Sequence, residues 1–112
     1  DFVYLHIEAS DEAGHEGDVD LKVRTIEYLD QRIVKPILEE VSTWSEPVCI
    51  AILPDHPTPC ALKTHTTDPI PFVIYKPDGK KDDVTVYDEF AARKGGYGEI
   101  REQEFMQLLL QQ

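Results

Sequence analysis

The stretch PVCIAIL at residues 47–53 is a continuous apolar run without a single charge. It is far shorter than the roughly 20 residues that a membrane span requires, and it lacks the alternation of a half-exposed strand. Such a run is typical of a central strand that is covered on both faces, as in a parallel sheet. The run therefore predicts an α/β fold, in which the segments on either side supply the remaining elements.

The segments before this run supply a strand and a helix. Residues 2–9 are rich in aromatic and β-branched side chains and predict a buried strand, followed by a loop over 10–18. Apolar side chains recur at helical spacing over 19–41, so we expect a long helix there, with a kink at Pro36 because its ring removes a donor and crowds the preceding turn. Strand, helix and strand form one βαβ crossover, and hence a mostly parallel sheet with flanking helices.

The segments after the run complete the predicted sheet and cover it. Residues 72–75 predict a third strand, which ends at the turn signal of residues 76–79. Residues 84–87 suggest a short edge strand, and the glycines of 95–98 mark a loop. Residues 102–110 predict a closing helix whose apolar side chains face the sheet.

Composition excludes several classes of partner. The 112 residues include 11 basic and 22 acidic side chains, so the formal net charge is −11. Because a nucleic-acid backbone and an anionic membrane would both be repelled, neither is an expected partner. The first twenty residues hold seven acidic side chains and no Lys or Arg, a cluster that bound cations or solvent must neutralise.

Length and cysteine content bound the organisation. The 112 residues fit one domain, or one piece of a larger domain. The two cysteines are too few for a disulfide framework, which favours a reducing cytoplasm. The chain begins at Asp1 and shows no signal peptide, so we expect residues 1–112 to be a fragment of a longer protein.

Acidic and histidine side chains gather at the ends of the predicted strands. Asp11 and His15 follow the first strand, Asp55 and His56 follow the second, and His65 precedes the third. In open parallel sheets ligands bind beyond the carboxyl ends of the strands. Carboxylate oxygen together with neutral imidazole is the ligand set of Zn²⁺ or Mn²⁺ rather than Ca²⁺ or Mg²⁺.

Each of these features also has a simpler interpretation. Asp11 and His15 have a spacing that many solvated loops contain, and Asp55 with His56 could be a turn that its own side chains hold. His6 alternates with apolar neighbours, so we expect it to be a core histidine with a satisfied ring. Cys49 fits plain core packing. Only the grouping of all five candidates at strand ends favours metal binding.

Three stretches resemble one family. Residues 11–18 (DEAGHEGD), 53–59 (LPDHPTP) and 63–72 (KTHTTDPIPF) resemble the archaeal-type, cofactor-independent phosphoglycerate mutases of the alkaline phosphatase superfamily. The resemblance covers nearly the whole chain and matches the C-terminal part of a protein several times longer. Proline at position 57, where related enzymes usually have glycine, favours the archaeal-type branch.

The resemblance implies a site with two divalent metal ions, Mn²⁺ or alternatively Zn²⁺, and no bisphosphoglycerate. Asp11, His15 and His65 match the three protein ligands of one ion, and Asp55 and His56 match two ligands of the other. The serine nucleophile of the family is missing here, because none of Ser10, Ser42 and Ser45 stands in its sequence context. Lys63, next to a ligand, is the cation that we would consider for contact with the substrate phosphate.

Three functions stay open at this point. The chain is the metal-binding C-terminal segment of a mutase that interconverts 3-phosphoglycerate and 2-phosphoglycerate, or it belongs to another phosphotransferase or phosphatase of the superfamily. Alternatively, the isolated chain is a non-catalytic metal-binding module. We expect Asp11, His15 and His65 to converge, with Asp55 and His56 beside them. We also expect the isolated chain to be inactive, and exposed apolar surface to make it self-associate.

Overall fold

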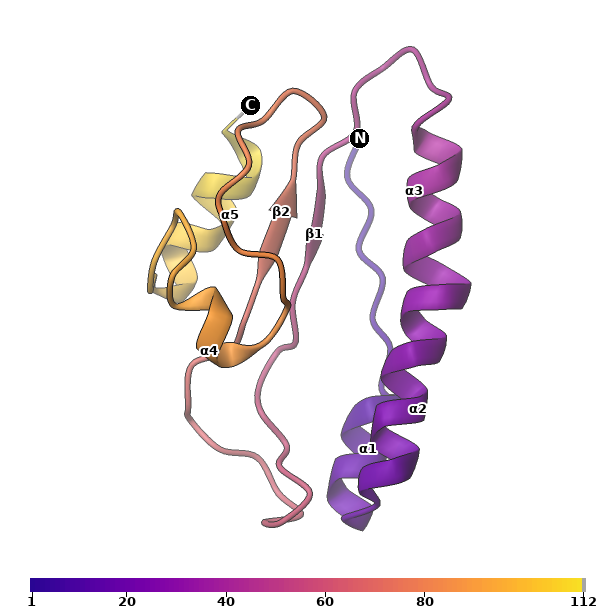
Figure 1. Cartoon of the computed structure of the whole chain (residues 1–112), viewed down its shortest axis with the longest axis vertical. Coiled ribbons are helices and arrows are strands. Elements are labelled where there is room, and N and C mark those ends of the chain that lie inside the picture. Colours follow the sequence, from indigo (N-terminus) through magenta and orange to yellow (C-terminus); the bar gives the residue numbers. More distant parts are fainter. Residues whose placement is uncertain (112) are drawn as a thin grey trace. The chain divides into compact units, whose positions relative to one another are not determined.

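The computed structural model describes residues 1–111, which divide into two compact units. The first unit comprises Asp1–Trp44 and Thr58–Thr67, and the second comprises Ser45–Pro57 and the residues from Asp68 onward. The first is helical and the second contains the strands (Figure 1). Helices together with a small sheet confirm the predicted α/β class. No helix within residues 1–111 is long and apolar enough to cross a membrane.

The helical unit begins with α1 (Ala9–Glu16) and α2 (Val19–Leu29), which pack against each other. Gly17 separates them at φ 72°, and the N–H groups of Gly17 and Asp18 donate to the Ala13 carbonyl, which closes the last turn of α1. The Asp18 side chain then accepts the N–H of Leu21 at 2.9 Å and caps α2. Two residues thus reverse the chain between the helices.

The long helix predicted over 19–41 is confirmed, and its irregularity lies where Pro36 requires it. A π-helical turn, Asp30–Val34, connects α2 to α3 (Lys35–Val41), and the Lys35 N–H donates to the Asp30 carbonyl, five residues back. Pro36 cannot donate and its ring crowds the preceding turn, so the helix widens just before it.

The strand unit is built on one antiparallel pair. β1 (Ile50–Ile52) pairs with β2 (Val73–Tyr75), with Ala51 opposite Ile74. α4 (Glu89–Ala92) and α5 (Glu102–Leu110) follow, and α5 has the bounds that its periodicity predicts. The rings of Phe72 and Phe105 pack edge to face with their centroids 5.4 Å apart, which anchors α5 beside β2.

Two side chains fix the loops of the strand unit. The Tyr87 hydroxyl lies 3.3 Å from the Ile52 carbonyl oxygen and 3.2 Å from that of Pro71, so it joins the end of β1 to the segment before β2. Burial of this hydroxyl, with Glu89 nearby, raises the pKa of Tyr87 to about 12. Asp82 accepts the N–H groups of Gly96 and Val84, and these bonds lower the pKa of its carboxyl.

Several sequence-based expectations are wrong. Residues 1–8 form no strand; Phe2 is 60% exposed and Val3 is 89% exposed, because no described segment offers these residues a pairing edge. The segment predicted as a loop over 10–18 is largely α1. Residues 84–87 are not a strand, and the expected parallel pairing is replaced, among residues 1–111, by the antiparallel β1–β2 pair.

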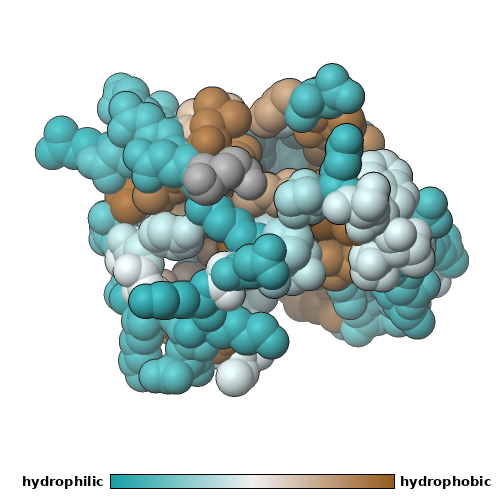
Figure 2. All heavy atoms as spheres, turned by 90° about the horizontal axis from the view of Figure 1, so that it is seen from above, coloured by the Kyte–Doolittle hydropathy of each residue, from teal (hydrophilic) through white to brown (hydrophobic). Residues whose placement is uncertain are grey.

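The hydrophobic core is small. Ala13 and Pro71 are the buried apolar side chains of the described residues, and no large side chain among them is fully buried. Hydrophobic residues accordingly reach the surface among hydrophilic ones in the view of Figure 2. His6, expected in a core, is exposed and lies 3.6 Å from the Glu8 carboxylate. Polar contacts therefore have a large part in holding the helical unit in shape.

Candidate metal centre

Helix α1 places the first two candidate ligands on one face. Asp11 and His15 are four residues apart, and residues at this spacing are neighbours on a helix surface. The Nε2 atom of His15 lies 3.3 Å from Oδ2 of Asp11. The segment predicted as a loop is thus a helix, and its geometry brings the two side chains together. The spacing of four residues between Asp11 and His15 was the sequence feature that could have indicated this helix.

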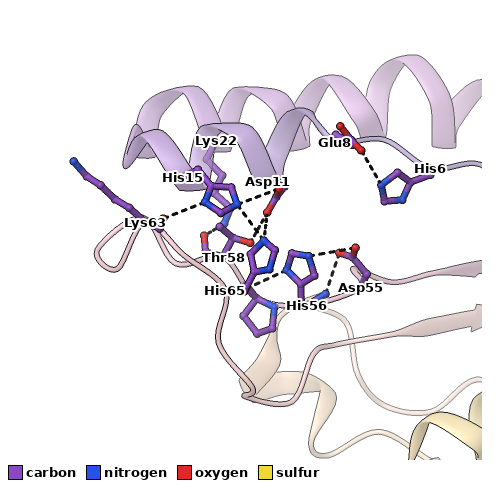
Figure 3. Close-up of polar contacts among 11 residues, drawn as sticks. His6, Glu8, Asp11, His15, Lys22, Asp55, His56, Thr58, Lys63 and His65 are labelled. Carbon is purple, nitrogen blue, oxygen red and sulfur yellow. Dashed lines mark hydrogen bonds and ion pairs between the residues drawn. The ribbon is translucent and has the colours of Figure 1, made fainter.

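His65 completes the cluster from a segment 50 residues later in the chain. Its Nε2 atom lies 3.2 Å from Oδ1 of Asp11 and 3.0 Å from Nε2 of His15 (Figure 3). Ligand atoms of the three side chains all lie within 4.8 Å of one another. All three residues belong to the helical unit, so this convergence is internal to one compact part of the protein.

The spacing of the three residues fits a divalent cation. Ligands about 2.1 Å from a common ion are separated by roughly 3.4 Å in a tetrahedron and roughly 3.0 Å in an octahedron. The shortest separations run from 3.0 to 3.3 Å, with Oδ2 of Asp11 nearest His15 and Oδ1 nearest His65. One carboxylate and two imidazoles are also the donor types expected for Zn²⁺ or Mn²⁺.

The hydrogen-bond partners of His15 agree with this fit. The Nδ1 atom of His15 lies 3.1 Å from the Lys63 carbonyl oxygen, which can only accept, so Nδ1 supplies the proton. In a neutral ring, Nε2 then presents a lone pair toward the Asp11 carboxylate, another acceptor. Two acceptors in contact require a proton or a cation between them. A second-sphere carbonyl that fixes the tautomer is typical of metal-bound histidines.

Thr58 orients the carboxylate and was missed by sequence reasoning. Its hydroxyl donates to Oδ1 of Asp11 at 2.6 Å, and its side chain and backbone are only 4% exposed. The carbonyl oxygen of Thr58 accepts from Nζ of Lys22 at 2.6 Å. Gly14 permits this approach, because a Cβ at position 14 would collide with the Thr58 carbonyl. Nothing in the local sequence pattern predicts this contact.

Lys63 contributes its backbone to the cluster. It adopts φ 53°, a left-handed conformation uncommon for a residue with a side chain, and this places its carbonyl on His15. Its side chain runs past Gly17, and Figure 3 shows the ammonium pointing away from Asp11 and His15. Contact between Lys63 and a substrate phosphate stays a prediction.

Asp55 and His56 lie in the strand unit, just after β1. The His56 N–H donates to Oδ1 of Asp55 at 3.0 Å, and Nε2 of His56 lies 3.3 Å from Oδ2 of Asp55. The ring nitrogen Nδ1 lies 3.3 Å from the Pro57 carbonyl oxygen. These two candidates thus contact each other within a turn, and their role as ligands of a second metal stays a prediction.

Comparisons with known proteins agree with this chemistry. The family model of the metalloenzyme superfamily matches residues 1–112. Named 2,3-bisphosphoglycerate-independent phosphoglycerate mutases from Methanosarcina barkeri and Methanosarcina mazei are 45% and 46% identical over 98% of the chain. A relative with the same function in its name, from Archaeoglobus fulgidus, is 42% identical over 110 residues.

A solved structure extends the likeness to three dimensions. The PH0037 protein from Pyrococcus horikoshii matches 98% of the chain with a TM-score of 0.89 and 38% sequence identity. The chain spans 32% of that protein and about 28% of the length of the Methanosarcina relatives. The family model matches all 112 residues of this chain, and the converged carboxylate and imidazole donors agree with it. The chain therefore belongs to the metalloenzyme superfamily.

Proposed function

We propose that this chain is the metal-binding part of a 2,3-bisphosphoglycerate-independent phosphoglycerate mutase, which interconverts 3-phosphoglycerate and 2-phosphoglycerate through a phosphoserine. The convergence of Asp11, His15 and His65 is the observation that supports this most strongly. The names of the relatives support the choice of reaction.

In this proposal the chain supplies ligands to two metal ions. Asp11, His15 and His65 hold one ion, while Asp55 and His56 supply two ligands of the second. Mn²⁺ is the preferred ion and Zn²⁺ the alternative, because imidazole and carboxylate suit both. When bound, such ions offset the charge of a phosphate dianion and lower the pKa of a serine hydroxyl.

The nucleophile is expected outside these 112 residues. Ser42, for example, donates its hydroxyl to the Glu39 carbonyl at 2.7 Å within helix α3, as a structural serine does. This chain's own part is to hold the rings of His15 and His65 beside the Asp11 carboxylate, whose two oxygens face them. No bisphosphoglycerate is required.

A second function rests on the breadth of the family match. The family match identifies a superfamily and not one reaction. A phosphatase or another phosphotransferase of this superfamily would therefore use the same triad. The substrate-binding residues that distinguish these enzymes from a mutase are not identified in this chain. In isolation, the chain is proposed to act only as a metal-binding module.

Location and assembly follow from the same features. Cys49 and Cys60 are both free, and free thiols suit the cytoplasm, where we place the protein. Exposed apolar side chains at Phe2, Val3 and Leu5 favour self-association of the isolated chain, because contiguous apolar surface is usually covered by a partner.

Titration of the purified chain with Mn²⁺ tests the metal assignment. Calorimetry should show one principal site, and Asp11→Ala combined with His15→Ala should weaken it at least about 100-fold, since two of three ligands are lost. The matched control is Glu12→Gln with Glu16→Gln, which removes two exposed charges from the same helix and should change affinity less than about threefold. Equal affinity in both double variants would refute the assignment.

A coupled mutase assay tests the division of roles. The purified 112-residue chain should show no turnover with or without Mn²⁺, because covalent catalysis needs the serine that we place elsewhere. Full-length protein containing this segment should be active, and should lose activity in the Asp11→Ala, His15→Ala variant. Turnover by the isolated chain would show that the nucleophile lies within it.

A further inference from the structure

Thr58 stands out among the polar side chains of the helical unit because it is buried. It is 4% exposed and is the buried polar residue of the described part of the chain. Burial of a hydroxyl is unfavourable unless it forms a hydrogen bond. The bond that it forms, at 2.6 Å to Oδ1 of Asp11, has the length of a strong hydroxyl–carboxylate hydrogen bond.

That bond determines how the carboxylate faces the two histidines. Oδ1 of Asp11 accepts from Thr58 and also lies 3.2 Å from Nε2 of His65, while Oδ2 lies 3.3 Å from Nε2 of His15. A quarter turn of the carboxylate about its last side-chain bond would break the Thr58 contact and move both oxygens away from the rings. The hydroxyl therefore favours the carboxylate plane that faces both histidines.

The position of Thr58 is itself fixed from two sides. The Lys22 ammonium, from α2, donates to its carbonyl oxygen at 2.6 Å. On the other side Thr58 lies directly against Gly14 of α1, where an added Cβ would come within 2.9 Å of the threonine methyl group. Residues of α1 and α2 thus contact Thr58 from both sides, and Figure 3 shows Thr58 between Lys22 and Asp11.

We propose that Thr58 is a positioning residue that holds the Asp11 carboxylate in its metal-binding orientation and thereby sets the affinity of the Asp11–His15–His65 site. The inference rests on the proposed metal function of that triad. Partners that orient a ligating carboxylate typically contribute 10- to 100-fold to metal affinity. Thr58 itself does not ligate the ion, and it acts through Asp11.

Thr58→Val and Thr58→Ser separate the hydroxyl from the shape of the side chain. Valine retains the volume and removes the donor, whereas serine retains the donor and removes the methyl group. In Mn²⁺ titrations of the purified chain, followed by electron paramagnetic resonance, the valine variant should bind about 10- to 100-fold more weakly. The serine variant should stay within about threefold of the unmodified chain.

Thermal unfolding of the metal-free proteins distinguishes positioning from mere structural support. A structural role would lower the metal-free Tm and leave the affinity of the folded protein unchanged. The proposal predicts a loss of affinity, and rescue of that affinity by serine. If the valine variant does not fold, serine is compared with Thr58→Ala, and serine should bind at least about 10-fold more tightly.

The outcomes separate this inference from the proposed function. Unchanged Mn²⁺ affinity in Thr58→Val, or equal affinities for serine and alanine, together with lost binding in Asp11→Ala, His15→Ala, would overturn the role of Thr58 and leave the triad intact. Unchanged binding in the triad variant would instead overturn the metal site itself.

Discussion

The two compact units each contain an aspartate and a histidine that sequence reasoning selected, but they hold these residues differently. In the helical unit, Asp11 and His15 share a helix face, and His65 reaches them from 50 residues away. In the strand unit, Asp55 and His56 are adjacent in sequence and contact each other within a turn. The triad therefore joins segments far apart in the sequence, whereas the Asp55–His56 contact is local.

The largest expected effect is on Mn²⁺ affinity, and it compares loss of Asp11 and His15 with loss of Asp55 and His56. Asp55→Ala combined with His56→Ala should leave the first Mn²⁺ site of the isolated chain within about threefold of its original affinity, whereas Asp11→Ala with His15→Ala should weaken it at least about 100-fold. Calorimetry on both double variants measures the ratio. A larger loss in the Asp55, His56 variant would reverse the ranking of the two regions.

Substitution of Gly14 should give the next largest effect, and the sign of the change in the free energy of unfolding tests its close contact with Thr58. In an open helix Gly→Ala stabilises by about 1 kcal/mol. At Gly14 the new Cβ would collide with Thr58, and overpacking of this kind costs about 1–3 kcal/mol, so Gly14→Ala should destabilise the chain and weaken Mn²⁺ binding. Urea unfolding at equilibrium measures the first effect and titration the second.

Gly98 in the strand unit is the matched control. It has φ 62° and no atom within 4 Å of an added Cβ, so Gly98→Ala meets only the backbone penalty of about 1 kcal/mol. Its Mn²⁺ affinity should not change. Stabilisation by Gly14→Ala, or equal metal affinities in the two variants, would show that Gly14 is not a point of close approach.

Tyr87→Phe tests the support of the strand unit and has a smaller effect. The variant loses the hydroxyl contacts to Ile52 and Pro71, which should lower the free energy of unfolding by about 1 kcal/mol near neutral pH. A pKa raised from 10.0 to about 12 means that the folded state favours the protonated hydroxyl. The stabilisation is therefore complete below pH 10 and is lost as the pH rises toward about 12.

The difference in stability between Tyr87→Phe and the unmodified chain should accordingly shrink between pH 10 and about 12. Denaturant unfolding at a series of pH values checks this, since the remaining tyrosines contribute equally to both proteins. A difference that is constant across this range would show that the hydroxyl is not buried against the two carbonyls.

Elements that depend on local pattern were predictable from the sequence. The helix over 19–41 and its disturbance before Pro36 follow from side-chain spacing and from the proline ring, and α5 follows from periodicity alone. The α1 helix was not predicted, because its two glycines resemble a loop. In the structure Gly14 is a contact point and Gly17 a helix terminus.

Features that depend on partners were not predictable in the same way. The apolar segment from Phe2 has the composition of a strand, but a strand forms only where another segment accepts its hydrogen bonds. The members of the triad were suggested by residue type and resemblance. The contacts of Thr58 with Asp11 and of the Lys63 carbonyl with His15 depend on where the segment Thr58–Thr67 lies against α1, which no local pattern specifies.

The central claim, that Asp11, His15 and His65 together hold a divalent cation, is tested most directly by locating the ion. Crystals of the chain grown with Mn²⁺ should give an anomalous difference peak about 2.0–2.2 Å from Nε2 of both histidines and from one oxygen of Asp11. The account predicts this peak as the strongest in the map, with the Thr58 hydroxyl still bonded to the carboxylate. A strongest peak elsewhere, or no peak among these three residues at saturating Mn²⁺, would contradict it.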